Sequence, residues 1–301
     1  MNLLKNWTLP IAMLIGALGY KVMDYLSFIT PYLIFTMLLL TFSKISLRDL
    51  RPRLSHLYLL CIEIVGAIAI YYILAPFDQI VAQGVMICII CPTATAAAVV
   101  TGKLGGDVAS ITTYTLLCNI AVAFVIPALF PIITNSSLKS QFSILNSQFL
   151  PAFLHIMGRI FPLLICPFLL AQLIRLIAPK INSKLTSISG LAFYMWAIAL
   201  TIAMGMTVRS LIEEPTDITT LIYLSLGSLI ACLFQFFTGK AIGKSTNDTI
   251  ACGQSLGQKN TILAIWICSA YLNPVTALAP GLYVIWQNIF NSTQLYLARK
   301  K

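Results

Sequence analysis

The stretch ACGQSLGQKNTILAIW, Ala251–Trp266, places polar residues and a lysine inside a segment that is otherwise suited to lipid. A charged side chain at the centre of a membrane helix costs about 2.5–3.5 kcal/mol on insertion scales. Gly253 and Gly257 flank the polar residues, which favours a helix that breaks within the membrane. A second apolar segment, CPTATAAAVVTGKLGG (91–106), contains Pro92, which lacks the backbone N–H that a continuous helix needs. The two segments predict interrupted membrane helices.

The rest of the chain has the composition of a polytopic membrane protein. Of its 301 residues, 59% are hydrophobic and 9% are charged. Soluble domains carry about 25% charged residues, so this surface is not built to face water. Apolar runs of about 18 residues or more predict spanning helices. We therefore predict an all-α membrane protein with ten spans, at 5–23, 29–46, 54–75, 79–104, 107–133, 149–178, 186–211, 217–243, 247–271 and 274–298.

Basic residues indicate the orientation of these spans, because cytoplasmic loops are enriched in Lys and Arg. Only Lys21, Lys139 and Arg209 fall in outer loops. With the N-terminus inside, 14 of the 19 basic residues are cytoplasmic: Lys5, Lys44, Arg48, Arg51, Arg53, Lys103, Arg175, Lys180, Lys184, Lys240, Lys244, Arg299, Lys300 and Lys301. We expect both termini in the cytoplasm and the protein in a bacterial inner membrane. The net charge of +10 then reflects topology and lipid headgroups, not nucleic-acid binding.

Cysteine and histidine residues show no pattern of a metal or redox site. All eight cysteines lie in apolar segments without a CxxC pair, and His56 and His155 are far apart. Such thiols are interpreted as small packing residues. A membrane-embedded enzyme would need clustered His, Asp or Glu, and a channel would need a continuous polar stripe along several helices. We therefore expect no enzyme activity and no cofactor.

The longest polar connection, Asn135–Gln148, divides the chain into residues 1–147 and 148–301, with five spans each. An odd number of spans per half makes the second half enter the membrane upside down. Inverted repeats of this kind, with broken helices at corresponding positions, are typical of secondary transporters. Each half has its break in its fourth span. The alternative is that these Pro and Gly residues only kink their helices.

These segments carry a resemblance to a known family. CPTATAAAVV, and GQSLGQKNTILA with APGLYVIWQNIFNS, resemble the bile acid:sodium symporter family, most specifically at Pro280, Gly281 and Asn288. The resemblance covers nearly the whole chain. It implies ten spans in two inverted five-span repeats. A panel of spans 1, 2, 6 and 7 would face a core of spans 3, 4, 5, 8, 9 and 10, with broken spans 4 and 9 crossing.

The family's sodium ligands are largely missing, which suggests a bacterial-type member with degraded sodium sites. The glutamate and glutamine of the family's E-x-G-x-Q-N pattern fall on Ser255 and Lys259. Alanine and isoleucine side chains cannot coordinate sodium, which takes hard oxygen ligands. A single weak sodium site at Thr115, Ser255 and Gln258 remains the alternative. Inferred ligand positions without a side-chain oxygen are Ala67, Ala97, Ala98 and Ile111.

Lys259 is expected to place a tethered cation near the vacated sodium position and to satisfy free carbonyls of the broken helix. Its candidate counter-ion is Glu63, the only acid away from the ends of a predicted span. Glu63 precedes Ala67 by four residues and so shares its helical face. The alternative for each residue is that its side chain extends to the nearer membrane interface instead of forming this pair.

The predicted substrate is a small to medium amphipathic organic anion. Half-helix N-termini at the two breaks would favour a carboxylate or sulfonate. The resemblance implies bile-acid-like or other organic acids, carried by alternating access. Because the sodium ligands are largely missing, we expect transport that does not need two sodium ions, with a proton, no coupling ion or one weakly bound sodium as the alternatives. Expected partners are this solute and the bilayer, with the chain a monomer. Residues expected around the solute are Thr93, Thr95, Ala97, Ala98, Asn260 and Thr261 from the breaks, facing Phe35, Met37, Phe193, Met195 and Trp196.

Overall fold

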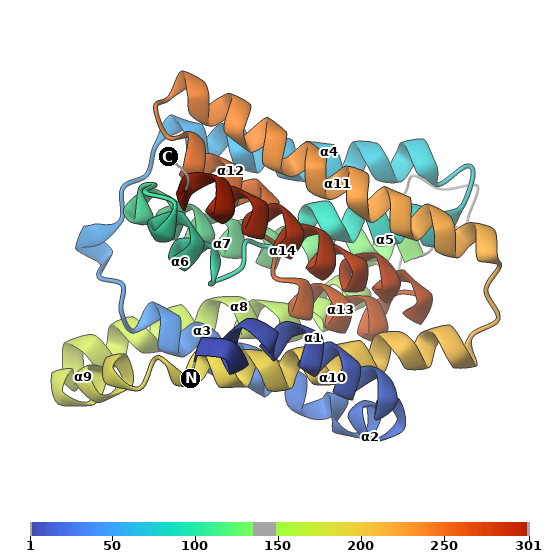
Figure 1. Cartoon of the computed structure of the whole chain (residues 1–301), viewed down its shortest axis with the longest axis horizontal. Coiled ribbons are helices and arrows are strands. Elements are labelled where there is room, and N and C mark those ends of the chain that lie inside the picture. Colours follow the sequence, from blue (N-terminus) through green and yellow to red (C-terminus); the bar gives the residue numbers. More distant parts are fainter. Residues whose placement is uncertain (1, 135–148, 300–301) are drawn as a thin grey trace.

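The structure, a computed structural model, describes residues 2–134 and 149–299. In this part of the chain every named element is helical (Figure 1). The connection Asn135–Gln148, where the two halves were expected to join, lies outside the described residues. The helices are α1 (Asn2–Leu18), α2 (Tyr20–Tyr25), α3 (Thr30–Phe42), α4 (Leu54–Leu74), α5 (Gln79–Ile90), α6 (Ala97–Lys103), α7 (Val108–Thr134), α8 (Phe149–Ile177), α9 (Pro179–Ser187), α10 (Leu191–Glu213), α11 (Ile218–Ser245), α12 (Thr249–Gly257), α13 (Thr261–Tyr271) and α14 (Leu278–Arg299).

Within the described residues, six helical stretches are long and apolar enough to cross a membrane. They are Tyr20–Phe42, Leu54–Leu74, Val108–Ile133, Phe149–Ile177, Leu191–Glu213 and Ile218–Ser245. The predicted fourth and ninth spans are each divided into two shorter helices, α5 with α6 and α12 with α13. The chain is thus an all-helical protein with strongly apolar spans.

The N-terminal region differs from the prediction. Residues 24–28 were expected to form a loop, but they are helical, and the first helix ends at Leu18. Asp24, the charge that suggested a loop, is held by an ion pair with Arg209 of α10. This partner lets the carboxylate stay in a helical segment beside apolar neighbours.

A short helix on the basic side was also not predicted. Residues 179–187 form α9, and α10 begins at Leu191 rather than at 186. Pro179 occupies the first turn of α9, where its missing N–H costs no hydrogen bond. Helix α9 therefore separates two spans that were expected to be joined by a loop.

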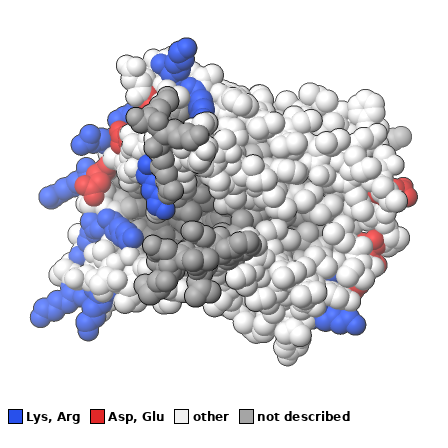
Figure 2. Space-filling view, viewed as in Figure 1, with Lys and Arg blue, Asp and Glu red and all other residues white. Residues whose placement is uncertain are grey.

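The helices form two groups in Figure 1. Helices α1–α3 and α8–α10 lie in the lower part of the view, and α4–α7 with α11–α14 lie above them. Apolar side chains from both groups share one buried cluster. Figure 2 shows Lys and Arg gathered at the left end of the long axis, where Figure 1 places α6 and α9. Basic side chains are thus concentrated at one end of the molecule.

Candidate functional site

The two broken helices meet at their breaks. Pro92 and Thr93 lie between α5 and α6, and Lys259 and Asn260 lie between α12 and α13. The Asn260 N–H donates to the Pro92 carbonyl at 2.8 Å, and Thr93 and Lys259 form an isolated antiparallel bridge. The Ala94 N–H donates to the Gln258 carbonyl at 2.8 Å. Each break thus supplies backbone partners to the other in a place where water is scarce.

Lys259 and Glu63 form an ion pair beside this crossing. The Lys259 Nζ lies 2.8 Å from Glu63 Oε1, and the two side chains are 1% and 0% exposed. The Tyr114 hydroxyl donates to Glu63 Oε2 at 2.5 Å, and the Cys118 thiol lies 3.2 Å from Oε1. The backbone N–H of Lys259 donates to Gln287 Oε1 at 2.9 Å. Helices α4, α7 and α14 therefore all contribute side chains around the ninth-span break.

The ammonium of Lys259 was expected to satisfy the free carbonyls of the broken helix, but it does not hydrogen-bond to them. Other donors occupy those carbonyls. Thr93 Oγ1 donates to the Ser255 carbonyl at 2.6 Å, and the Tyr283 hydroxyl donates to the Gly257 carbonyl at 2.9 Å. In the described part of the chain, Lys259 Nζ has no hydrogen-bond partner of good geometry besides its ion pair. These carbonyls are therefore already paired with hydroxyl groups from the fourth-span break and from α14.

The expected substrate residues divide into buried and accessible groups. Thr95, Ala98 and Asn260 are half-buried, whereas Thr93 and Thr261 are buried. Asn260 Oδ1 accepts the Leu263 N–H at 3.3 Å and so caps the N-terminus of α13. Thr93 takes part in the crossing through its bridge with Lys259, whereas the half-buried residues keep part of their surface accessible. Ala97 is fully buried.

The positions expected from the sequence to correspond to sodium ligands are mostly apolar and packed. Ala97, Ile111 and Ala251 form a small buried cluster, with Ala98 packed against it. Ala67 is also fully buried. These side chains fill the space with carbon atoms rather than oxygen ligands.

Three polar residues remain for a metal ion. Thr115 donates its hydroxyl to the Ile111 carbonyl of its own helix at 2.8 Å. Ser255 is buried, and Gln258 Oε1 is buried without a hydrogen-bond partner among the described residues. These oxygens are the available ligands for a single ion.

The residues of α3 and α10 that were expected to face the solute pack against the main buried apolar cluster. Phe35, Met195 and Trp196 contact the main apolar cluster, and Met37 belongs to it. The rings of Phe193 and Trp196 are in contact, with centroids 5.8 Å apart and planes tilted by 31°. They form an apolar and aromatic surface on α3 and α10.

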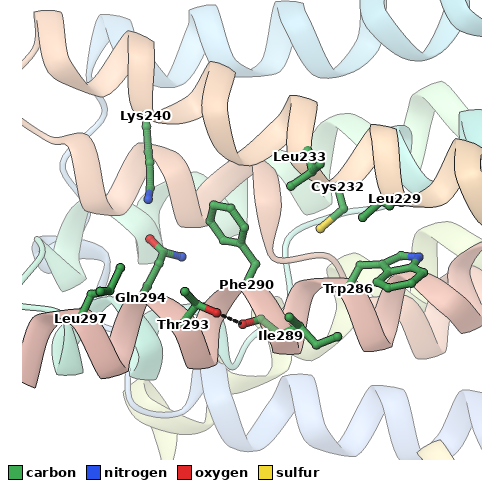
Figure 3. Close-up of a pocket in the computed structure, with 10 residues that line it drawn as sticks. All are labelled: Leu229, Cys232, Leu233, Lys240, Trp286, Ile289, Phe290, Thr293, Gln294 and Leu297. Carbon is green, nitrogen blue, oxygen red and sulfur yellow. Dashed lines mark hydrogen bonds between the residues drawn. The ribbon is translucent and has the colours of Figure 1, made fainter.

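Two cavities lie away from the crossing. One, of about 340 Å³, is lined by residues at the start of α5 and the end of α13, including Gln83 and Asn273. The other, of about 280 Å³, lies between α11 and α14 (Figure 3). Neither is lined by Thr95 or Asn260.

An ionic cluster at the basic end was missed from the sequence. Arg53 contacts Asp248 at 3.0 Å and Asp107 at 2.6 Å, and Ser110 donates its hydroxyl to Asp248. His56 Nε2 lies 3.0 Å from the Ser110 hydroxyl. Each of Arg53, Asp107 and Asp248 directly precedes a helix, α4, α7 and α12. That shared position is the signal that could have predicted the cluster.

The partners of the Glu63–Lys259 pair were also missed. Tyr114 and Cys118 are four residues apart and so lie on one face of α7. Gln287 is a polar residue in the apolar part of α14. The four-residue spacing of Tyr114 and Cys118 marks one face of α7, but it does not indicate which helix that face meets.

Comparisons with known proteins add to this geometry. A sequence model of the SBF-like CPA transporter family matches residues 47–299. No curated protein matches the chain. The matched range includes both broken helices, Glu63 and Lys259. Since it covers most of the chain and bears out the resemblance to the bile acid:sodium symporters, the chain belongs to the SBF-like CPA transporter family.

Proposed function

We propose that the chain is a secondary transporter of a small to medium organic anion, in which the Lys259 ammonium takes the place of bound sodium. The observation that carries this proposal is the buried 2.8 Å pair of Lys259 and Glu63 beside the crossing helices. A fixed cation there supplies positive charge without an ion from solution. It also raises the electrostatic cost of placing sodium close by.

The architecture proposed is that of two inverted five-span repeats, residues 1–147 and 148–301. Helices α1–α3 and α8–α10 would form the panel, and the other helices the core. The two groups in Figure 1 support this division, as does the placement of one broken helix pair in each half. Alternating access would then consist of movement of one group against the other.

The solute site proposed lies at the crossing. Thr95, Ala98 and Asn260 are its half-buried members, with Thr93 and Thr261 behind them. The N-terminus of α13 contributes a positive dipole end, which favours a carboxylate or sulfonate. Aromatic side chains on α3 and α10 suit the apolar part of such an anion.

Sodium-independent coupling is favoured by the apolar cluster at Ala97, Ile111 and Ala251. A change in the protonation of Glu63 or Lys259 during the cycle would couple transport to protons. If both groups keep their charges throughout, the protein would be a uniporter. A one-sodium symporter is the second candidate. The unpartnered Gln258 Oε1, near Ser255 in sequence, is the observation that favours it.

The remaining proposals concern the cellular setting. The chain would act as a monomer in a bacterial inner membrane, with both termini in the cytoplasm and without enzyme activity. The gathering of basic residues at one end supports this orientation (Figure 2).

Uptake into proteoliposomes tests the function. Labelled bile acids and smaller carboxylates and sulfonates would be offered with sodium or choline outside, across a pH series. We expect uptake that persists in choline and is lost in Lys259→Gln, while Lys103→Gln, an exposed lysine, leaves it unchanged. Strict sodium dependence with a steep concentration response would instead support the sodium symporter. Unchanged uptake in both Thr95→Ala and Asn260→Ala would disprove the solute site.

A further inference from the structure

A groove between α11 and α14 is lined mainly by apolar side chains and has one lysine, Lys240, at one end. Its volume is about 280 Å³. Figure 3 shows Lys240 reaching from α11 toward α14, with Phe290 beside it. Leu229, Leu233, Trp286 and Ile289 line the remainder. The groove is therefore polar at the end that contains Lys240 and apolar along the rest.

The lysine stands at the end of the groove nearest the basic side of the protein. Lys240 lies five residues before the end of α11, and Gln294 lies five residues before the end of α14. Leu229 precedes Lys240 by 11 residues, about 16 Å along a helix at 1.5 Å per residue. Half of a hydrocarbon core is about 15 Å thick. The groove thus runs from the headgroup region to about the middle of the bilayer.

Lys240 is half-buried, and its side chain packs against neighbours in the groove. Its stem packs over Gly253 of α12, where an added Cβ would lie 2.7 Å from the Lys240 Cγ. Its ammonium lies 5.0 Å from the centre of the Phe290 ring. A cation beside an aromatic face is stabilised there even with little hydration. A lysine at this depth would otherwise extend along the helix toward the interface.

No acidic side chain within residues 2–134 and 149–299 pairs with Lys240. The Gln294 amide also lines this end of the groove and donates one long hydrogen bond, 3.3 Å, to Asn291. An ammonium without a counter-ion and an amide donor form a receptor for a phosphate group. Basic pockets between membrane helices on the cytoplasmic side bind anionic headgroups by this chemistry.

We propose that this groove binds one anionic phospholipid, with its phosphate on Lys240 and Gln294 and an acyl chain along Leu229, Leu233 and Ile289. The charge of the lysine selects the headgroup, and the apolar length selects a chain. The groove borders α12 but shares no lining residue with the proposed solute site. The proposal therefore holds or fails independently of what the protein transports.

The test uses the full chain, purified and stripped of lipid in detergent. Phosphatidylglycerol or phosphatidylcholine with identical chains would be added, and bound lipid measured by native mass spectrometry together with thermal stabilisation. We expect phosphatidylglycerol to bind preferentially. Lys240→Gln should weaken its binding about five-fold, the effect of roughly one lysine near a headgroup. Lys244→Gln, an exposed lysine on the same helix outside the groove, should leave binding unchanged.

A second variant tests the acyl chain. Ile289→Trp fills the groove without altering its charge, and we expect it to weaken the binding of both lipids. Equal effects of Lys240→Gln and Lys244→Gln would overturn the proposal, as would equal binding of the two lipids. A lipid-free dimer that Lys240→Gln or Ile289→Trp disrupts would show that a second copy of the chain occupies the groove instead.

Discussion

At the scale of single residues, the two members of the Lys259–Glu63 pair differ in how many partners they have. Glu63 has three partners, the Lys259 ammonium, the Tyr114 hydroxyl and the Cys118 thiol. Within the described residues, the ammonium has only Glu63. Removing water from two charges costs several kcal/mol per ion, which attraction repays only with good geometry. Loss of one member therefore harms the fold more than loss of both.

Lys259→Met should lower the free energy of unfolding by about 3–5 kcal/mol, because it leaves Glu63 buried and uncompensated. The double variant Lys259→Met with Glu63→Leu should recover most of that loss. Denaturant unfolding in micelles measures both. If the double variant were as unstable as the single one, the pair would not be the source of the effect.

Sequence reasoning identified this pair because each member is a rare charge in an apolar segment. Glu63 is the only acid away from the ends of a predicted span, and Lys259 lies at a helix break. The partners Tyr114 and Gln287 were not identified, because neither carries a charge that stands out in an apolar segment. Their role depends on which helix faces cross, which a single sequence does not specify.

At the scale of elements, the broken ninth span depends on a close approach at Gly257. An added Cβ there would lie 2.3 Å from the Phe236 ring. Phe236 in turn stacks on Phe290 with ring centroids 4.2 Å apart, so it has little room to move. The glycine thus lets α12 pack against α11 where the helix ends.

Gly257→Ala should destabilise the protein by about 1–3 kcal/mol through overpacking. Gly66→Ala is the matched control, because the nearest atom to its added Cβ lies 4.0 Å away. That change should be neutral or stabilising, since Ala favours a helix by up to about 1 kcal/mol. Thermal unfolding in detergent compares the two. Equal effects would remove the packing explanation.

Asp107 connects helix capping to the ionic cluster at the basic end. Its Oδ1 accepts the Ala109 and Ser110 N–H groups at 2.9 and 3.0 Å. Although partial burial opposes ionisation, the backbone hydrogen bond from Ser110 and the ion pair with Arg53 hold the pKa of Asp107 below its usual range. The ionised carboxylate therefore stabilises the folded protein.

Asp107→Ala should lower stability by about 1 kcal/mol, the cost of a lost N-cap. Asp107→Asn should lose less, because its amide oxygen still caps α7. A lowered pKa means that the charge stabilises above the unfolded value of about 3.9, and that this is lost as pH falls through the folded value. The difference between wild type and Asp107→Ala in thermal unfolding should be constant from pH 7 to 5 and shrink below 4. A difference that grows with acid would contradict this assignment.

The breaks in the fourth and ninth spans were predicted, because Pro92 and the polar run before Asn260 act locally. The helical residues 24–28 were not, because Asp24 is retained by Arg209, 185 residues away in sequence. Helix α9 was missed because it is mainly polar and its pattern is not that of a span. Local sequence signals were sufficient where neighbouring residues determine the backbone conformation. They were not sufficient where a side chain distant in the sequence supplies the stabilising contact.

At the scale of the whole molecule, the two groups of helices share an extensive apolar contact. Composition and charge predicted a membrane protein and an orientation for its spans. The packing of one group on the other could not be predicted, because the contact surfaces are apolar on both sides and lack a distinctive pattern. Thr207 of α10 and Gly281 of α14 lie at this contact.

A disulfide between these two helices tests whether the groups must move. A Cβ built at Gly281 would lie 3.8 Å from the Thr207 Cβ, the mean separation across a disulfide. We expect the oxidised double variant Thr207→Cys with Gly281→Cys to lose transport, because the bond fixes α10 to α14. Reduction should restore uptake in proteoliposomes, and each single variant under the same oxidant controls for the native cysteines. Full transport by the cross-linked protein would show that α10 and α14 keep their relative position throughout the cycle, so that any alternating access must arise from movement within the core helices.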